Sequence, residues 1–365
     1  MAEDGTNTMP KLRVLLVGAT GIAGQQFVSA LREHPWFEIT ALAASPRNAG
    51  KRYSEAVASS WFLPEDVPPE VGALRLLDPG QLEGKAFDLV FSAVEADVAR
   101  ELEPKLAVDV PVVSTANALR METDVPLLVP QVNAAHAPLL DAQRARGWKG
   151  WVAPIPNCTA TGLVVALAPL AERFGLRSVI LTSLQAVSGA GRSPGVAALD
   201  VLDNVVPYIA KEEGKVEAET RKILGRWAPG SPRVEEHPLR LSATCTRVAV
   251  QDGHTESVSV SLGRPASVEE VKEAFQTWEG APEVRDLPSA PPRWIELLEA
   301  MDRPQPRLDR DTHGGMATSI GRVREDAVLE NGVKFVLVTH NTKMGAARGA
   351  VLVAELMRAR GRVGR

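Results

Sequence analysis

The segment LRVLLVGATGIAG, residues 12–24, decides the fold of this chain. A short apolar run ends there in Gly18, Gly21 and Gly24, and residues 25–32 behind it have helical spacing. Gly18 permits a tight turn, Gly21 lets the backbone approach a pyrophosphate, and Gly24 allows close packing of helix on strand. The helix start also offers unpaired N–H groups and the positive end of its dipole. This order predicts a dinucleotide-binding turn, although many glycine loops merely reverse the chain.

Strand and helix patterns alternate through the rest of the first half. The expected elements are strands over 38–44, 87–93 and 111–114 and a helix over 97–107. Such repetition predicts a mostly parallel sheet joined by right-handed crossovers. Farther along, residues 178–185 and 256–262 alternate apolar and polar side chains, as half-buried antiparallel strands do. The second half should therefore form a separate α+β unit.

These patterns predict an α/β protein with two domains. We expect residues 1–155 to form a Rossmann-type dinucleotide-binding domain and residues 156–339 to form an α+β domain. A strand over 334–339 and a helix over 345–358 end the chain.

Composition and charge limit the class of protein. A net charge of -4 argues against binding to a nucleic-acid backbone, and two cysteines in 365 residues indicate a reducing compartment without a disulfide framework. Residues 1–13 lack a secretory signal, and the uncharged, proline-containing run 150–171 is interpreted as a buried core helix rather than a membrane span. Two proline-rich passages, 287–294 and 303–310, are expected to be surface excursions. We expect a cytoplasmic protein with no nucleic-acid, membrane or metal partner.

The second strand ends without an acidic residue that could bind a ribose 2′-hydroxyl. Ser45 and Arg47 stand there instead, and Lys51 follows. A carboxylate would repel a 2′-phosphate, whereas Ser45 and Arg47 could bind one. The pattern favours NADP over NAD, with a solvated basic loop as the alternative.

Cys158 stands in PNCT at the start of an apolar helix. A cysteine at a helix N-terminus feels the helix dipole, which lowers its pKa and makes thiolate available. An isolated free cysteine is, however, more often an inert core residue. Cys245 lies inside the strand-like LSATCTRVAV, and we assign it no role.

A histidine and an arginine follow in RVAVQDGHTE. The Gln-Asp-Gly turn is expected to place His254 at a loop tip, shortly after the strand that carries Arg247. A histidine there can exchange protons near neutral pH and serve a cysteine nucleophile. A single loop histidine is, on the other hand, usually just solvated.

Two further segments fit an anionic substrate. Residues 188–192, SGAGR, are flexible enough to pack over a cofactor ring. Glu212, Lys215, Glu219 and Lys222 share one helix face, and spacing alone favours a solvated stripe of ion pairs.

Taken together, the motifs carry a family resemblance that spans nearly the whole chain. The chain resembles aspartate-semialdehyde dehydrogenase, and more closely the archaeal and fungal branch of that family. The matching stretches are GATGIAG, ALAASPRNAGK, SAVEADVA, STANALRMETDVPLLVPQVN, PNCT, LQAVSGAG, DNVVPYIAKEEGKVEAETRKILG, SATCTRVAVQDGHTES, DRPQPRLDRD and HNTKMGAARGA.

The resemblance implies roles for individual residues. Cys158 would be the nucleophile, His254 the general acid/base, and Gln185 a residue that positions the acyl intermediate. The substrate would be bound by Arg247 at its carboxylate, by Glu212 at its amino group, and by Arg120, Lys215 and Asn117 at its phosphate. NADP would be contacted by Gly18, Thr20, Gly21, Ile22, Gly24, Ser45, Arg47, Ser92, Gly189 and Asn341.

The implied reaction is the NADPH-dependent reductive dephosphorylation of 4-aspartyl phosphate to aspartate 4-semialdehyde through a cysteine thioester. It serves the biosynthesis of lysine, threonine, methionine and isoleucine. The resemblance also implies that residues 156–339 form a catalytic and dimerisation domain, that residues 340–365 return to the first domain and complete it, and that the protein is a homodimer or homotetramer. Two alternatives stay open at this point: a malonyl-CoA reductase of the same fold, and a non-catalytic NADP-binding protein.

Overall fold

The first sheet has six parallel strands in the order β3-β2-β1-β4-β5-β6. The computed structural model describes residues 10–191, 196 and 198–364. The strands of this sheet are β1 (Leu12–Val17), β2 (Phe37–Ala43), β3 (Leu76–Leu77), β4 (Leu89–Ser92), β5 (Val112–Ser114) and β6 (Val152–Pro154). This is the strand order of the doubly wound dinucleotide-binding fold. The predicted Rossmann-type sheet is confirmed.

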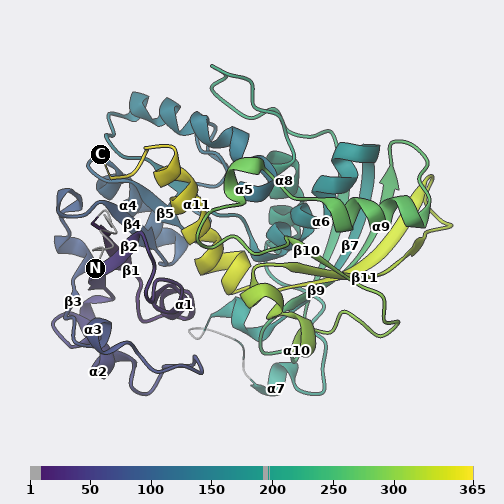
Figure 1. The fold of residues 1–365 in the computed structure, drawn as a ribbon. Helices are drawn as coiled ribbons and strands as arrows, with labels where there is room; N and C mark the ends of the chain where they lie inside the picture. Colours follow the sequence, from purple (N-terminus) through teal and green to yellow (C-terminus); the bar gives the residue numbers. More distant parts are fainter. Residues whose placement is uncertain (1–9, 192–195, 197, 365) are drawn as a thin grey trace, which may run out of the picture.

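Helices pack against this sheet, so strands β4, β5 and β6 are buried throughout, whereas β2 and β3 keep exposed positions. The helices of this part are α1 (Ile22–Ala30), α2 (Tyr53–Val57), α3 (Pro69–Gly72), α4 (Ala96–Ala107) and α5 (Pro130–Asn133). The C-terminal helix α11 (Arg348–Ala359) packs against α1 and β5, and Figure 1 shows it in yellow beside them. The end of the chain thus returns to the first sheet. The exact limits of the two domains, at residues 155 and 340, stay a prediction.

The second sheet also has six strands, in the order β10-β11-β12-β9-β7-β8. Its strands are β7 (Leu176–Gln185), β8 (Arg240–Arg247), β9 (His254–Leu262), β10 (Ile295–Leu298), β11 (Thr318–Glu325) and β12 (Gly332–Thr339). Strand β9 pairs antiparallel with both β7 and β12, which confirms the predicted antiparallel strands, whereas β7 and β8 run parallel. The helices here are α6 (Cys158–Phe174), α7 (Ala198–Val201), α8 (Glu212–Ile223), α9 (Val268–Thr277) and α10 (Pro306–Asp309).

Helix α6 lies between the two sheets in the chain and is almost wholly buried. It packs on β9, β12 and α9. Residues 158–171 of the uncharged run therefore form the predicted core helix, whereas the start of that run forms strand β6 and the turn before Cys158. No helix in the described part of the chain is long and apolar enough to cross a membrane. The predictions for residues 1–9, including the missing secretory signal, lie outside the described residues.

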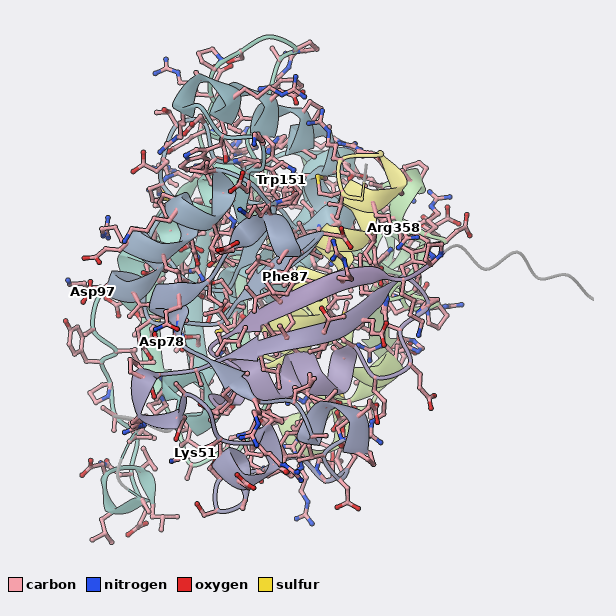
Figure 2. The ribbon with its side chains drawn as sticks, turned by 90° about the vertical axis from the view of Figure 1, so that its left-hand side faces the viewer. Lys51, Asp78, Phe87, Asp97, Trp151 and Arg358 are labelled. Atoms are coloured by element: carbon pink, nitrogen blue, oxygen red, sulfur yellow. The ribbon has the colours of Figure 1, made fainter. Side chains whose placement is uncertain are left out.

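The loops that follow the parallel strands meet at one edge of the first sheet. In Figure 2, Lys51 after β2, Asp78 after β3 and Asp97 after β4 lie toward one side, away from Phe87 and Trp151, which precede β4 and β6. In open parallel sheets, ligands bind at this carboxyl-terminal edge, where the strand order reverses. The glycine turn after β1 lies at this edge.

The two proline-rich passages were predicted to be surface excursions, and this was wrong in part. Leu287 and Trp294 are 7% and 3% exposed, and residues 306–309 form helix α10, where Asp309 is 2% exposed. Asp309 accepts a hydrogen bond from the backbone N–H of Gln305 at 2.6 Å, and it pairs with Arg303. The cited partners of Asp309 lie within the same passage, so the passage folds into a compact local turn whose carboxylate is buried.

Candidate active site

The three glycines of the first turn serve two different purposes. Gly18 has a φ of +79°, and a Cβ atom there would lie 2.3 Å from the carbonyl oxygen of Ala93. A Cβ on Gly24 would lie 2.3 Å from the carbonyl oxygen of Gly18, so both glycines are required by backbone packing. Gly21 meets only Gly18, at 3.6 Å, and it faces a cleft. Gly21 therefore leaves room for a group that approaches the start of helix α1.

The cleft has a volume of about 620 Å³ and runs from the glycine turn to Cys158. Among the predicted residues, its walls include Thr20, Gly21, Ile22, Arg47, Asn117, Arg120, Cys158, Gly189, Glu212, Lys215 and Asn341. The other predicted residues, Gly18, Gly24, Ser45, Ser92, Gln185, Arg247 and His254, are not among its lining. The structure thus brings most of the predicted cofactor and substrate residues to the lining of one cleft, and the others do not line it. Arg192, at the end of the predicted flexible segment, lies outside the described residues.

Cys158 is the first residue of helix α6 because Asn157 caps that helix. The Asn157 Oδ1 atom accepts from the backbone N–H groups of Thr159 and Ala160 at 2.8 and 3.2 Å. Its Nδ2 atom donates to Glu212 Oε1 at 2.7 Å. Asparagine is among the preferred N-cap residues, because its side chain satisfies N–H groups that the helix leaves unpaired. The cap fixes where the helix starts and therefore where the thiol points.

His254 lies beside the thiol, with its Nε2 atom 3.1 Å from Cys158 Sγ. The prediction of a loop tip was wrong, since His254 is the first residue of β9 and is fully buried. The turn before it does bend the chain, but the following strand carries the ring into the protein. The backbone N–H of Ala186 donates to His254 Nδ1 at 3.1 Å. The neutral ring must then carry its own hydrogen on Nε2, facing the sulfur.

Burial controls the charge of this pair. Burial, aided by Glu212, raises the pKa of Cys158 to about 12, although Arg120 and Arg247 act in the opposite direction. Burial, together with the nearby charges of Arg247 and His340, lowers the pKa of His254 to about 3. The lowered thiol pKa predicted from the helix start is thus wrong for the protein without ligand. Both groups are uncharged at neutral pH, which makes a charged nucleophile dependent on what enters the cleft.

Gln185 and Arg247 end two adjacent strands and lie opposite each other in the register of β7 and β8. Arg247 Nη1 donates to the carbonyl oxygen of Ala186 at 2.7 Å, and Gln185 Nε2 donates to Ser183 Oγ at 3.2 Å. Both side chains are buried. Gly189 lies against this group, because a Cβ there would stand 2.9 Å from Arg247 Nη1 and 3.2 Å from His254 Cε1.

The polar face of helix α8 turns toward the cleft. Glu212, Glu219 and Lys222 are 7%, 2% and 6% exposed, so the prediction of a solvated stripe was wrong for them. Lys215 is more exposed and lies 3.5 Å from Glu212 Oε2. Burial lowers the pKa of Lys222 to about 8. The face packs against the loop after β5, which the sequence pattern of the helix alone does not reveal.

Arg120 lies in that loop, in the wall of the cleft. Its Nη1 atom donates to Glu219 Oε1 at 3.0 Å, and its Nη2 atom donates to the carbonyl oxygen of Thr115 at 3.0 Å. The buried Nε atom has no hydrogen-bond partner within the described part of the chain. The two bonds hold the guanidinium in place, and its positive charge is suited to attract an anion in the cleft.

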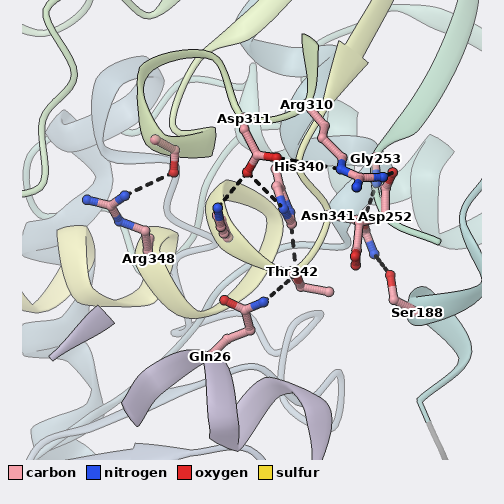
Figure 3. A network of polar contacts seen from close by, with 12 residues as sticks. Gln26, Ser188, Asp252, Gly253, Arg310, Asp311, His340, Asn341, Thr342 and Arg348 are labelled. Carbon is pink, nitrogen blue, oxygen red and sulfur yellow. Dashed lines mark hydrogen bonds and ion pairs between the residues drawn. The ribbon is translucent and has the colours of Figure 1, made fainter. Parts of the chain in front are cut away.

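A polar network holds the turn before His254 from behind (Figure 3). Asn341 Oδ1 accepts from the backbone N–H of Gly253 at 2.8 Å, and Asn341 Nδ2 donates to Ser188 Oγ at 2.8 Å. Arg310 Nη1 donates to the carbonyl oxygen of Asp252 at 3.0 Å. Asn341 therefore joins the cleft wall to the strand that carries the histidine.

The same network reaches the helix that follows the glycine turn. Thr342 Oγ1 accepts from Gln26 Nε2 at 3.1 Å and contacts His340 Nδ1 at 3.3 Å. Asp311 lies between His340 Nε2 at 3.6 Å and Lys343 Nζ at 2.6 Å. Helix α1 and the turn at Gly253 are thus bridged by one short segment, residues 340–343.

Sequence reasoning missed several of these residues. Asn157 had a usable signal, because an asparagine directly before a helix is a typical cap. Glu219 and Lys222 had no such signal, since their partners lie far away in the chain. Arg310 stands in a proline-rich passage that was predicted to be a surface excursion, and Asp311 follows directly after that passage.

Known proteins match this chain along most of its length. Residues 13–139 match the family model described as semialdehyde dehydrogenase, NAD binding domain, and residues 167–344 match the one described as semialdehyde dehydrogenase, dimerisation domain. An aspartate-semialdehyde dehydrogenase of Archaeoglobus fulgidus is 46% identical over 346 residues, which cover 94% of this chain and 96% of that protein. The corresponding protein of Methanothermobacter thermautotrophicus is 43% identical, with 95% of this chain and 99% of that protein covered.

A solved structure agrees with these relatives. The crystal structure of the Candida albicans aspartate semialdehyde dehydrogenase with NADP matches with a TM-score of 0.87 and 40% sequence identity. The match covers 97% of this chain and 100% of the Candida albicans chain. Sequence, fold and the cleft, with its half-buried cysteine beside a buried histidine, point to the same conclusion. The chain belongs to the aspartate-semialdehyde dehydrogenase family.

Proposed function

We propose that this enzyme reduces 4-aspartyl phosphate to aspartate 4-semialdehyde, reversibly, with NADPH and through a thioester on Cys158. The observation that carries the proposal is the 3.1 Å contact between Cys158 Sγ and His254 Nε2, beside a cleft that also includes the glycine turn and Arg120. A nucleophile, a donor and a cationic group for a leaving phosphate are then close together. The product would feed the biosynthesis of lysine, threonine, methionine and isoleucine.

NADP fits the first half of the cleft. The open space at Gly21 and the start of helix α1 suit a pyrophosphate, and Arg47 in the same wall suits a 2′-phosphate. We propose that Thr20, Ile22 and Asn341 complete the site, with Ser45 beside it and Ser92 behind it. Gly189 lies where this part of the cleft meets Arg247 and His254, so it borders both the cofactor and the substrate. When bound, NADPH supplies the hydride that reduces the thioester carbonyl.

The substrate fits the second half of the cleft. Arg120, with Asn117 and Lys215 beside it in the wall, would hold the phosphate. Arg247 would pair with the α-carboxylate, and Glu212 would pair with the amino group. We propose that Gln185, at the end of the neighbouring strand, supports the acyl group through its fixed position next to Arg247.

The cysteine carries out the bond changes. The sulfur attacks the acyl carbon, a carbon–sulfur bond forms, and the carbon–oxygen bond to phosphate breaks with its electron pair leaving on phosphate. The thiol proton passes to the departing phosphate, which leaves as hydrogen phosphate, and the thiolate released later takes up a proton from water. After hydride addition, the carbon–sulfur bond breaks and its electron pair returns to Cys158. His254 presents an N–H to the sulfur and to the adjacent substrate oxygen, which stabilises the charge that develops there. To become a full imidazolium, the ring must exchange its Ala186 contact for a proton on Nδ1.

The proposed function also implies a domain organisation and an oligomeric state. We propose a Rossmann-type domain over residues 1–155, completed by 340–365, and a catalytic and dimerisation domain over 156–339. We further propose a cytoplasmic homodimer or homotetramer. The exposed apolar side chains of Leu199 and Tyr208, at 89% and 64%, suit a contact with a second copy of the chain.

One assay tests the proposed reaction. NADP reduction is followed with aspartate semialdehyde, in parallel with phosphate, with CoA and with neither, and Cys158→Ser serves as the inactive control. Phosphate-dependent reduction supports the proposal. Reduction that needs CoA, with malonate semialdehyde as the better substrate, would assign the malonyl-CoA reductase reaction instead. No turnover under any condition would favour a non-catalytic NADP-binding protein.

A further inference from the structure

Glu219 is a buried carboxylate on helix α8 that has no role in the reaction proposed above. Its side chain is 2% exposed. The Oε1 atom accepts from Arg120 Nη1 at 3.0 Å, and the Oε2 atom accepts from the backbone N–H of Asn157 at 2.6 Å. One side chain therefore binds the cation of the cleft wall and the residue that precedes the nucleophile.

The two partners belong to different parts of the fold. Arg120 follows strand β5 of the first sheet, 99 residues before Glu219. Asn157 is the cap that precedes helix α6, 62 residues before Glu219. Both residues line the cleft. Because their common partner is a single carboxylate, their separation depends on that group rather than on the chain between them.

Two other residues of α8 bond to only one member of this pair: Lys222 bonds to the loop of Arg120, and Glu212 bonds to Asn157. Lys222 Nζ donates to the carbonyl oxygens of Arg120 and Glu122 at 2.7 and 2.9 Å, and Glu212 accepts from the Asn157 side chain. Within the described part of the chain, Glu219 is the α8 residue that bonds both. The helix thus fixes the loop of the cation and the start of the nucleophile helix, and Glu219 joins them.

We propose that Glu219 is a positioning residue that sets the distance between the phosphate-binding guanidinium of Arg120 and the thiol of Cys158. This inference rests on the proposed function, in which the phosphate lies on Arg120 while the acyl carbon meets the sulfur. A single substrate must satisfy both contacts at once. A misplacement of about 1 Å can reduce a rate by about a hundredfold, so the spacing matters for the phosphate-dependent step.

Glu219→Gln tests the bridge with little change in volume. An amide has one acceptor oxygen, so it can keep the bond to Arg120 or the bond to Asn157 but not both. Glu217→Gln is the matched control, because Glu217 lies on the same helix and accepts from the backbone N–H of Ala243 at 3.1 Å. Glu219→Asp is a second variant that keeps the charge, for use if the glutamine variant does not fold by circular dichroism.

Kinetics in the oxidative direction give the first readout. In Glu219→Gln we expect the KM for phosphate to rise about tenfold or more, as a charged hydrogen bond is lost, while the KM for NADP stays near that of wild type. Glu217→Gln should leave both constants unchanged. An unchanged phosphate KM in folded Glu219→Gln overturns the proposal, and so does a parallel rise in both constants, which indicates general loosening of the fold.

Alkylation of Cys158 by iodoacetamide gives a second readout that does not need turnover. The reagent is uncharged and does not require Arg120, so the thiol of Glu219→Gln should react at least as fast as that of wild type. Inorganic phosphate should protect the thiol in wild type and in Glu217→Gln, and this protection should be lost in Glu219→Gln. Equal protection in all three proteins overturns the role of Glu219. A wild type that is protected by phosphate but inactive in the assay overturns the proposed reaction alone.

Discussion

Replacing Gly189 by alanine decides which part of the site this glycine serves. The sequence suggested that Gly189 packs over a cofactor ring, whereas its added Cβ would lie 2.9 Å from Arg247 Nη1 and 3.2 Å from His254 Cε1. Gly189 has no left-handed backbone conformation, so alanine meets a steric conflict there rather than backbone strain. The displaced group is the guanidinium that donates to the Ala186 carbonyl oxygen at 2.7 Å.

The size of the effect follows from that contact. A hydrogen bond from a charged group contributes about 1.5–3 kcal/mol, which corresponds to about a ten- to hundredfold change in rate. We therefore expect kcat/KM for aspartate semialdehyde to fall by about that factor in Gly189→Ala, with the KM for NADP unchanged, in a spectrophotometric assay of NADPH formation. The control is Gly214→Ala on helix α8, where an added Cβ meets nothing within 4 Å. A raised KM for NADP with unchanged substrate kinetics would refute this reasoning and return Gly189 to the cofactor.

Five other variants test further predictions. Arg47→Ala should erode a preference for NADP over NAD of about tenfold or more while leaving NAD kinetics intact; equal kcat/KM for both cofactors in wild type contradicts this. Cys158→Ser should abolish turnover and Cys245→Ser should not, with mass spectrometry locating the inactivating iodoacetamide label on Cys158. His254→Asn should be slower by about 10²–10⁴-fold and, because the ring is buried and accepts a backbone N–H, less stable in urea; full activity excludes its role. Burial raises the pKa of Glu103 to about 7, so its folded form holds more protons than the unfolded chain and its stabilisation is lost as pH rises from about 4.5 to 7; Glu103→Gln should remove that pH dependence in urea titrations.

Local patterns were sufficient for the glycine turn, for strands β7 and β9 and for the start of helix α6. The glycine turn was predictable because Gly24 meets the backbone of Gly18 and Ala19 a few residues away and Gly18 has a φ of +79°. Strands β7 and β9 were predictable because one of their faces is buried, which leaves an alternating pattern. The start of helix α6 at Cys158 follows from the asparagine before it.

Tertiary structure decided which residues of the site are buried, and with it the protonation of Cys158 and the partners of Glu219. His254 follows a turn in the sequence, but its burial is set by the strands on either side of β9 and by the helix packed on that sheet. The same burial raises the pKa of Cys158, which a helix start alone would have lowered. Glu219 belongs to a helix face that looks solvated, and only the approach of two distant segments supplies its partners. Periodicity is a property of neighbours along the chain, whereas desolvation and ion pairing depend on neighbours in space, and the sequence pattern does not contain those.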